Sequence, residues 1–152
     1  MLMHCIITQN SRAEGRFGGV VLNTKFITEL VEQAGGTSRF YYFPQSENRR
    51  GGRLQLTVTQ TVAQIRAAMN TANATDALIL AVFPDEDITQ ATVWTTFNID
   101  EVIMAWPAAN RLHTYVEINQ KGSGVKRYLV DSYYRELEML AETASTSTST
   151  TT

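Results

Sequence analysis

The sequence predicts an α+β fold made of two tandem, similar modules, each a small antiparallel β-sheet with a C-terminal helix. The first observation is an internal repeat, because displacing the chain by about 75 residues places Leu22-Asn23 on Phe97-Asn98. The second is the alternation of apolar and polar residues over 54–58, which is typical of a strand with one solvent-facing side. The third is a helical spacing of apolar residues near the end of each half.

The repeat also predicts the domain boundaries. We expect a first module over residues 1–72, a second over 75–142, and a Ser/Thr-rich tail over 143–152. A module of about 70 residues buries only a modest core, so we expect the two modules to pack together with pseudo-twofold symmetry. The tail is small and polar and is expected to be disordered when free.

Composition restricts the class of protein. A formal net charge of -2 argues against a protein that coats nucleic acid by charge alone, and 43% hydrophobic residues is ordinary for a soluble globular chain. The longest apolar runs, such as 77–83, are too short to span a bilayer, so we expect no membrane partner. Residues 1–5 have no basic region ahead of an apolar one, so we expect no secretory signal there. Cys5 is the only cysteine, which excludes an intrachain disulfide and fits a reducing, cytoplasmic compartment.

Two strands are predicted at the start of each module. Residues 3–8 and their counterparts 78–83 are continuous apolar runs, which indicates strands buried on both faces or at the module interface. Residues 20–22 and 94–97 predict the second strands. Each of these ends at an asparagine.

The next element has two readings. Residues 25–33 have helical spacing and good helix formers, and Gly35-Gly36 behind them would end a helix. The counterpart, 100–106, is β-branched and aromatic and is followed by Pro107, which favours a strand. We favour a strand in both copies, because tertiary pairing often overrides local propensity.

A hairpin and a helix complete each module. The hairpins are predicted over 39–58 and 114–130, each with a polar, glycine-containing connection. Thr61 and Gln64 have the spacing of a capping box, which predicts the start of the first helix. Asp131 is a suitable N-cap for the second.

No group of residues indicates catalysis, a cofactor or a metal. His4 and His113 are the only histidines, and neither falls on a histidine of the other half. His4 and Cys5 are adjacent in a predicted strand and so point to opposite faces, with no third ligand indicated. The acidic residues 85–87 lack the alternating ligands and the glycine of a calcium loop, so a solvated turn is expected. We therefore predict no enzyme, no cofactor and no metal site.

The basic residues indicate a candidate interaction site. They cluster at the two predicted hairpin tips, and the aromatic residues of the preceding strand could stack on bases, so nucleic acid is an alternative partner. A structural role is the other explanation for these basic residues, because charged hairpin tips discourage edge-to-edge pairing between chains. The tip residues are Arg49, Arg50, Arg53, Lys121, Lys126 and Arg127.

Aromatic residues outnumber what two small cores need. Surplus aromatic side chains are often found at protein interfaces. We therefore expect contacts with other structural proteins of an assembly or with further copies of this chain. The candidate interface aromatics are Tyr41, Tyr42, Trp94, Trp106, Tyr133 and Tyr134.

One pattern resembles a known group of proteins. An apolar-apolar-Leu-Asn segment ending at Asn23, then Ile27, a hairpin over 39–58 and a helix from Thr61 are similar to small β-meander-plus-helix proteins of flagellar operons and bacteriophage genomes. Phe97, Asn98, Val102, Trp106, the hairpin 114–130 and the helix from Ser132 repeat this pattern.

The resemblance covers about two thirds of each copy, and the tandem duplication with its extra first strand departs from it. It implies a small accessory or assembly protein of phage origin, with no catalytic residues to carry over. We therefore expect a non-enzymatic virion component, such as a minor capsid, decoration or connector protein. Such a protein would be made in the host cytoplasm and located in the virion.

Overall fold

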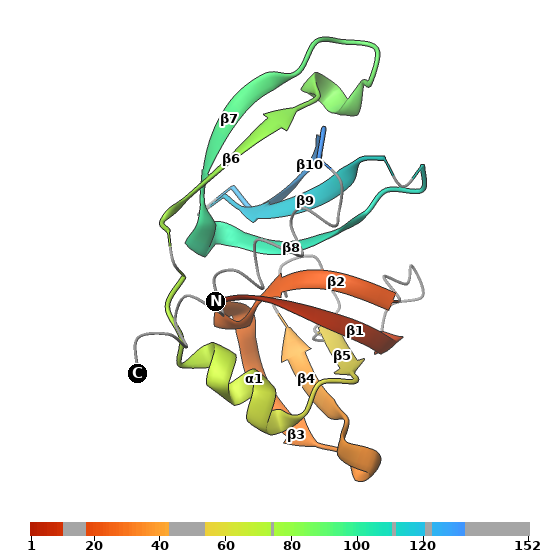
Figure 1. Cartoon of the computed structure of the whole chain (residues 1–152), viewed down its shortest axis with the longest axis vertical. Helices are drawn as coiled ribbons and strands as arrows, with labels where there is room; N and C mark the ends of the chain where they lie inside the picture. The colour runs from red at the N-terminus through yellow and green to blue at the C-terminus, as the bar shows by residue number, and fades with distance from the viewer. Residues whose placement is uncertain (11–17, 43–53, 74, 111, 121–122, 133–152) are drawn as a thin grey trace.

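The described part of the chain forms one antiparallel β-sheet of ten strands (Figure 1). The computed structural model describes residues 1–10, 18–42, 54–73, 75–110, 112–120 and 123–132. The strands are β1 (Leu2–Asn10), β2 (Gly18–Asn23), β3 (Ile27–Glu32), β4 (Ser38–Tyr42), β5 (Leu54–Val58), β6 (Ala77–Val82), β7 (Val93–Asn98), β8 (Val102–Pro107), β9 (Thr114–Asn119) and β10 (Val125–Val130). The described residues also form the helix α1 (Val62–Met69) and the 3₁₀ turns η1 (Thr24–Phe26), η2 (Ala34–Gly36), η3 (Pro84–Glu86) and η4 (Ile99–Glu101).

The predicted α+β class, with two modules that each have their own sheet, is wrong, because the fold is mainly β and one sheet continues through both halves. The strand order is β3-β4-β5-β1-β2-β8-β9-β10-β6-β7. The β2–β8 ladder, in which Val21 pairs with Ala105 and Leu22 with Met104, joins the two halves. The hydrophobic pattern of a strand shows which of its faces is buried but not which strand lies along its edge. For that reason the sequence did not reveal this ladder.

The predicted pseudo-twofold symmetry is also wrong. The first five strands lie in the order β3-β4-β5-β1-β2, and the last five repeat it as β8-β9-β10-β6-β7. A twofold axis makes every contact reciprocal, so a β2–β8 ladder would require a β7–β3 ladder as well, and the described residues form none. Here β2 pairs with β8, which is the counterpart of β3, so the two halves join head to tail.

The segment with two readings is a strand in both halves, which confirms the reading that we favoured. Residues 25–33 contain η1 and then β3, and the helical alternative is wrong. Both β3 and β8 have a bulge at their second residue, Thr28 in one and Ile103 in the other. Pairing with β4 and with β9 therefore decides the conformation of these segments over their local propensity.

The asparagine at the end of the second strand has the same local role in both halves. Asn23 Oδ1 accepts a hydrogen bond from the Lys25 N–H at 3.1 Å, and Asn98 Oδ1 accepts one from the Asp100 N–H at 3.0 Å. An asparagine side chain that caps the following N–H groups is a common way to begin a 3₁₀ or α turn. Both asparagines thus start the turn that leads into the next strand.

The helix α1 begins at the predicted capping box, which is confirmed. Gln64 N–H donates to Thr61 Oγ1 at 3.2 Å, and Thr61 N–H donates to Gln64 Oε1 at 2.9 Å. Ile65 is fully buried and fixes α1 against the core of the first half. The second predicted helix, which would follow Asp131, and the tail over 143–152 lie outside the described residues.

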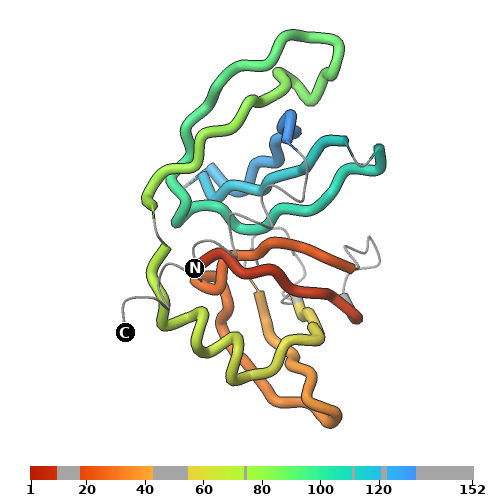
Figure 2. Tube along the Cα trace, in the orientation of Figure 1, coloured from red at the N-terminus to blue at the C-terminus, as the bar shows by residue number. Residues whose placement is uncertain are grey.

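Two hydrophobic cores lie on the two sides of the junction, and the junction strands contribute to both. Leu22 of β2 packs into the core of the first half, together with Ile103 and Met104 of β8. Val21 of β2 packs instead into the core of the second half, together with Leu2 of β1. The chain path in Figure 2 shows the two halves meeting along β2 and β8. Each core is therefore completed by a strand from the other half.

Candidate interaction surfaces

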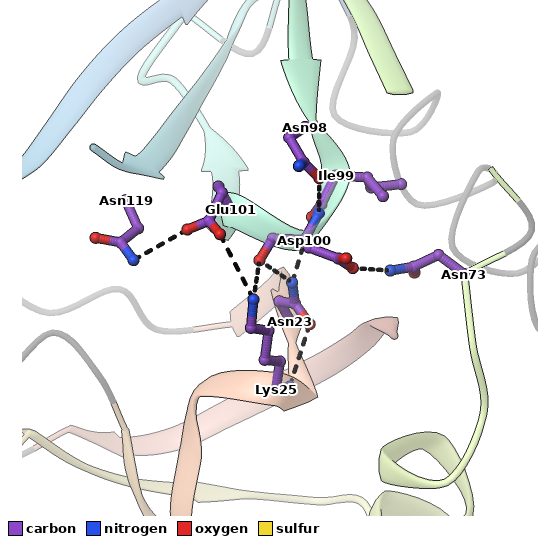
Figure 3. Close-up of polar contacts among 8 residues, drawn as sticks. All are labelled: Asn23, Lys25, Asn73, Asn98, Ile99, Asp100, Glu101 and Asn119. Carbon is purple, nitrogen blue, oxygen red and sulfur yellow. Dashed lines mark hydrogen bonds and ion pairs between the residues drawn. The ribbon is translucent and has the colours of Figure 1, made fainter. Parts of the chain in front are cut away.

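The contact between the halves shows how this chain joins two of its sheet edges (Figure 3). Asn23 Nδ2 donates to the carbonyl groups of Ile99 and Asp100, both at 3.3 Å. Lys25 Nζ donates to the Asp100 carbonyl at 3.4 Å and forms an ion pair with Glu101, with 3.6 Å between Nζ and Oε1. The end of β2 and η1 are thereby connected to η4, immediately ahead of β8.

Two further asparagines hold the carboxylates of η4. Asn73 Nδ2 donates to Asp100 Oδ1 at 3.3 Å, while Asn73 Oδ1 accepts from the Leu2 N–H at 3.0 Å. Asn119 Nδ2 donates to Glu101 Oε2 at 3.0 Å (Figure 3). The acidic side chains of η4 are therefore fixed from both sides of the junction.

Tyr42 is buried at this junction, although the sequence predicts it as an interface aromatic. The Asn23 N–H donates to Tyr42 Oη at 3.0 Å. The Tyr42 hydroxyl in turn donates to the Asn23 carbonyl at 3.0 Å or to the carbonyl of Ile103, and it has one proton to share between them. Tyr42 therefore connects the two halves of the chain and presents no surface to a partner.

The strands β3 and β7 are the two ends of the sheet. Within the described part of the chain, each pairs with one neighbouring strand, β3 with β4 and β7 with β6. They are the counterparts of β8 and β2, which pair with each other at the junction. The sequence of β7, Val-Trp-Thr-Thr-Phe-Asn, contains no charged residue. Charged side chains are a common protection of edge strands against pairing with other chains.

An apolar face is exposed on the β6–β7 hairpin. Trp94 is 75% exposed and Ile79 is 60% exposed. Ile79 pairs with Thr96, and Ala81 pairs with Trp94, so these four residues lie on one face of the hairpin. We call these four residues the Trp94 face; Ala81 is 8% exposed, and the other three are exposed. The opposite face, which carries Leu80, packs into the core of the second half.

The continuous apolar sequence of β6 predicted a strand buried on both faces or at the module interface. This prediction is wrong, because Ile79 of β6 is 60% exposed. Val93 and Ile88, which lie on β7 and on the connection ahead of it, are also more than half exposed. Of the predicted interface aromatics, Trp94 is the one that lies mostly exposed in the described residues. An apolar run cannot by itself distinguish a strand covered by its own chain from one that leaves a face open.

The other predicted aromatics lie elsewhere. Tyr41 is half-buried in β4, one residue from the buried Tyr42. Trp106 is half-buried against the core of the first half, and its ring lies 5.6 Å from that of Tyr115. Tyr133 and Tyr134 lie outside the described residues.

Most of the predicted basic tips cannot be placed. Of their six residues, Arg49, Arg50, Arg53 and Lys121 lie outside the described residues. Lys126 and Arg127 are on β10, and each lies over an aromatic ring. Lys126 Nζ is 4.8 Å from the ring centroid of Tyr128, and the Arg127 guanidinium carbon is 4.5 Å from that of Tyr115.

Arg127 also forms a bidentate pair with Glu86. Arg127 Nε donates to Glu86 Oε1 at 2.7 Å, and the same guanidinium donates to Oε2 at 3.0 Å. This hydrogen bonding raises the pKa of Arg127 above its usual range. The guanidinium therefore already has an anionic partner, which is the group that a phosphate would have to replace.

The acidic turn after β6 is held by local contacts. Asp87 Oδ1 accepts from the Thr89 N–H at 2.9 Å and from the Thr89 hydroxyl at 2.6 Å, and Asp87 Oδ2 accepts from Gln90 Nε2 at 3.2 Å. These bonds lower the pKa of Asp87, the Thr89 side chain contributing most. Asp85 and Glu86 have φ values of 54° and 58°, which is the left-handed region.

The described histidines and the cysteine do not form a metal site. His113 Nε2 is 3.5 Å from Asp131 Oδ1, and its Nδ1 is 2.9 Å from Asn110 Nδ2. Cys5 is fully buried, and burial raises the pKa of its thiol to about 12. Among the described residues, no three His, Cys, Asp or Glu side chains gather closely enough to hold a metal ion.

Comparison with known proteins adds no relative. No protein-family model matches this chain, and neither does any curated protein or solved structure. In the part of the chain that the structure describes, no helix has the length and apolar character needed to cross a membrane. The resemblance to β-meander-plus-helix proteins stays a prediction from the residue pattern.

Proposed function

We propose that this chain is a non-enzymatic structural protein that acts through protein–protein contacts in an assembly. The Trp94 face is the observation that carries the proposal. It combines a tryptophan and an isoleucine, each more than half exposed, on the hairpin that ends the sheet. Tryptophan is enriched among the residues that dominate the binding free energy of interfaces.

The location of this face at a sheet edge strengthens the argument. Covering the side chains of Trp94 and Ile79 with another protein would contribute about 2 to 4 kcal/mol of hydrophobic free energy. The adjacent edge of β7 could add main-chain hydrogen bonds to a strand of the partner. A contact of this kind needs no pocket and no reactive group.

Nucleic-acid binding remains the alternative from the sequence, and it has less support. It depends on the basic tips, where Arg127 is paired with Glu86 and stacked on Tyr115. The assembly that we propose is a virion, with the chain as a minor capsid, decoration or connector protein made in the host cytoplasm. The resemblance of the residue pattern to small proteins of phage genomes supports this part of the proposal.

Tryptophan fluorescence and light scattering test the proposal together. The chain has two tryptophans, so Trp106→Phe leaves Trp94 as the single reporter and Trp94→Phe leaves Trp106. Where the partners in the assembly are further copies of this chain, mass should rise with protein concentration, and the emission of the Trp106→Phe protein should shift to shorter wavelength as it does. The Trp94→Phe protein is the matched control, and its emission should shift less.

A single-stranded DNA titration separates the two functions. An assembly protein should show the same mass with and without the DNA. A chain that stays monomeric and binds the DNA with an affinity that falls steeply as salt rises would overturn the proposal.

A further inference from the structure

We propose that copies of this chain join head to tail, with β7 of one copy pairing antiparallel with β3 of the next. This inference rests on the proposed function and names the partner of the Trp94 face as a second copy of the chain. The internal junction is the first observation that supports it. The chain already joins its halves by pairing β2 with β8, and β7 and β3 are the counterparts of these two strands at the two ends of the sheet.

In a head-to-tail contact, each copy pairs one of its two end strands and keeps the other available for a further copy. Each added copy would present a new β7 edge or a new β3 edge, so the contact generates a ring if it closes and a filament if it does not. A twofold contact, such as β7 with β7, would stop at a dimer. The repeated strand order of the sheet favours the first arrangement, because the chain contains one such step within itself.

The internal junction also supplies the register. The pairs Val21–Ala105 and Leu22–Met104 correspond, in their counterparts, to Thr96 of one copy opposite Leu30 of the next and Phe97 opposite Glu29. Both β3 and β8 carry their bulge at the second residue, so the two edges have the same local shape. A β3 edge of this shape can follow β7 as β8 follows β2.

The apolar surface is located where this contact needs it. On the first half, Leu2 and Val21 lie on the face of β1 and β2 that the second half covers, and they are 2% and 1% exposed. Their counterparts on β6 and β7 are Ala77 and Thr96, which are exposed beside Trp94. The Trp94 face itself corresponds to His4, Ile6, Gly19 and Val21 of the first half, of which Val21 is buried, His4 and Gly19 are half-buried and Ile6 is 41% exposed. A neighbouring copy would therefore cover Thr96 and the part of the Trp94 face next to it.

The ion pair of the internal junction has no equivalent between copies. In the internal junction, Lys25 of the β2 side reaches the Asp100 carbonyl and the Glu101 carboxylate of the β8 side. The counterparts of Lys25 and Glu101 are Asp100 and Phe26, so no salt bridge is expected at the matching positions. The contact between copies therefore depends on main-chain pairing and apolar surface.

The contact between copies should be weaker than the internal one. The buried Ile103 of β8 corresponds to the exposed Thr28 of β3, so less apolar surface is available. Tyr42, whose hydroxyl joins the halves, corresponds to Ile118, which has no hydroxyl to donate. We therefore expect reversible association that depends on protein concentration.

Two variants that each block one end test the inference. Thr96→Lys places a charge on the β7 end, and Thr28→Lys places one on the β3 end. Ala72→Lys, at an exposed position between α1 and β6, adds the same charge away from both ends. Circular dichroism should give all three variants the melting temperature of the wild type to within a few degrees, which shows that they are folded.

Light scattering then distinguishes the arrangements. We expect wild type and Ala72→Lys to increase in mass with concentration, and Thr96→Lys and Thr28→Lys each to stay monomeric. A mixture of the two blocked variants should form a one-to-one dimer and nothing larger, because each retains the end that the other lacks. Failure of the mixture to dimerise, or assembly by Thr28→Lys alone, would overturn head-to-tail pairing.

A monomeric wild type would also overturn the inference without overturning the proposed function. In that case the Trp94 face would bind a different structural protein. The emission of the Trp106→Phe chain, purified within its native assembly, would then lie at shorter wavelength than that of the isolated chain. Emission equal to that of the isolated monomer would count against the proposed function itself.

Discussion

The hydroxyl group of Tyr42 hydrogen-bonds to the backbone carbonyl of Ile103, a residue in the other half of the chain. Tyr42 is the last residue of β4, and Ile103 is the bulged residue of β8. A bulge leaves backbone groups out of the ladder, and buried carbonyl groups need partners. Tyr42 supplies one, and it also accepts from the Asn23 N–H at 3.0 Å. One side chain thus satisfies backbone groups from both halves.

Tyr42→Phe should lower the free energy of unfolding by about 2 to 3 kcal/mol, because it leaves several buried backbone groups without their partner. Urea unfolding measures this change. Tyr115→Phe is the matched control, since Tyr115 is half-buried and its ring contacts are kept, so a change within about 0.5 kcal/mol is expected. Equal losses in the two variants would contradict the role assigned to the Tyr42 hydroxyl.

The repeated asparagine turn offers a comparison within one protein. Asn98→Ala removes the cap of η4 at an exposed position and should cost about 1 kcal/mol. Asn23→Ala removes the equivalent cap, and it also leaves the carbonyl groups of Ile99 and Asp100 without the Nδ2 donor. Asn23 is buried, so its loss should cost roughly 2 to 3 kcal/mol. Chemical denaturation of both variants checks the order, and equal losses would show that the junction contacts of Asn23 contribute nothing.

Much of the local structure was predictable from the residues. Alternation over 54–58 indicates a strand, and Thr61 with Gln64 indicates the start of α1, because these patterns depend on neighbours in sequence. Leu22-Asn23 and Phe97-Asn98 likewise indicate two equivalent strand ends. These elements were right because local geometry determines them.

The architecture was not predictable in the same way. The β2–β8 ladder depends on which edges meet, and nothing in the sequence of either strand specifies a partner more than 70 residues away, about half the chain. The sequence also did not show which strand aromatics are buried and which are exposed. Tyr42 and Trp94 are both strand aromatics, yet one is fully buried and the other is 75% exposed. The continuous apolar sequence of β6 likewise gave no indication that Ile79 faces outward.

The buried thiol of Cys5 should make stability depend on alkaline pH. Its pKa is raised by burial from 9.0 to about 12, so the folded chain keeps the proton when the unfolded chain loses it. The unfolded state is therefore favoured as pH rises above 9.0. The loss should be about 1.4 kcal/mol per pH unit until the folded thiol also ionises.

Cys5→Ala isolates this effect from the other groups that titrate in the same range. Urea unfolding of both proteins between neutral pH and pH above 9.0 should give curves that converge as pH rises, because the variant lacks the thiol. The thiol of the folded wild type should also react slowly with a disulfide reagent, since it is buried and protonated. Parallel stability curves, or fast labelling of the folded chain, would contradict the buried position of Cys5.

The left-handed turn after β6 supports a final prediction. Asp85 is exposed and has a φ of 54°, a conformation that costs a residue with a side chain about 1 kcal/mol and costs glycine little. Asp85→Gly should raise the free energy of unfolding by about 0.5 kcal/mol, after the greater freedom of glycine in the unfolded chain is allowed for. Glu86→Gly relieves a similar φ of 58° but removes the bidentate pair with Arg127. An exposed pair is worth up to about 1 kcal/mol, so Glu86→Gly should be less stable than Asp85→Gly by about that amount. Thermal unfolding of the two variants measures the difference. A Glu86→Gly protein at least as stable as Asp85→Gly would show that the ion pair with Arg127 does not stabilise the turn.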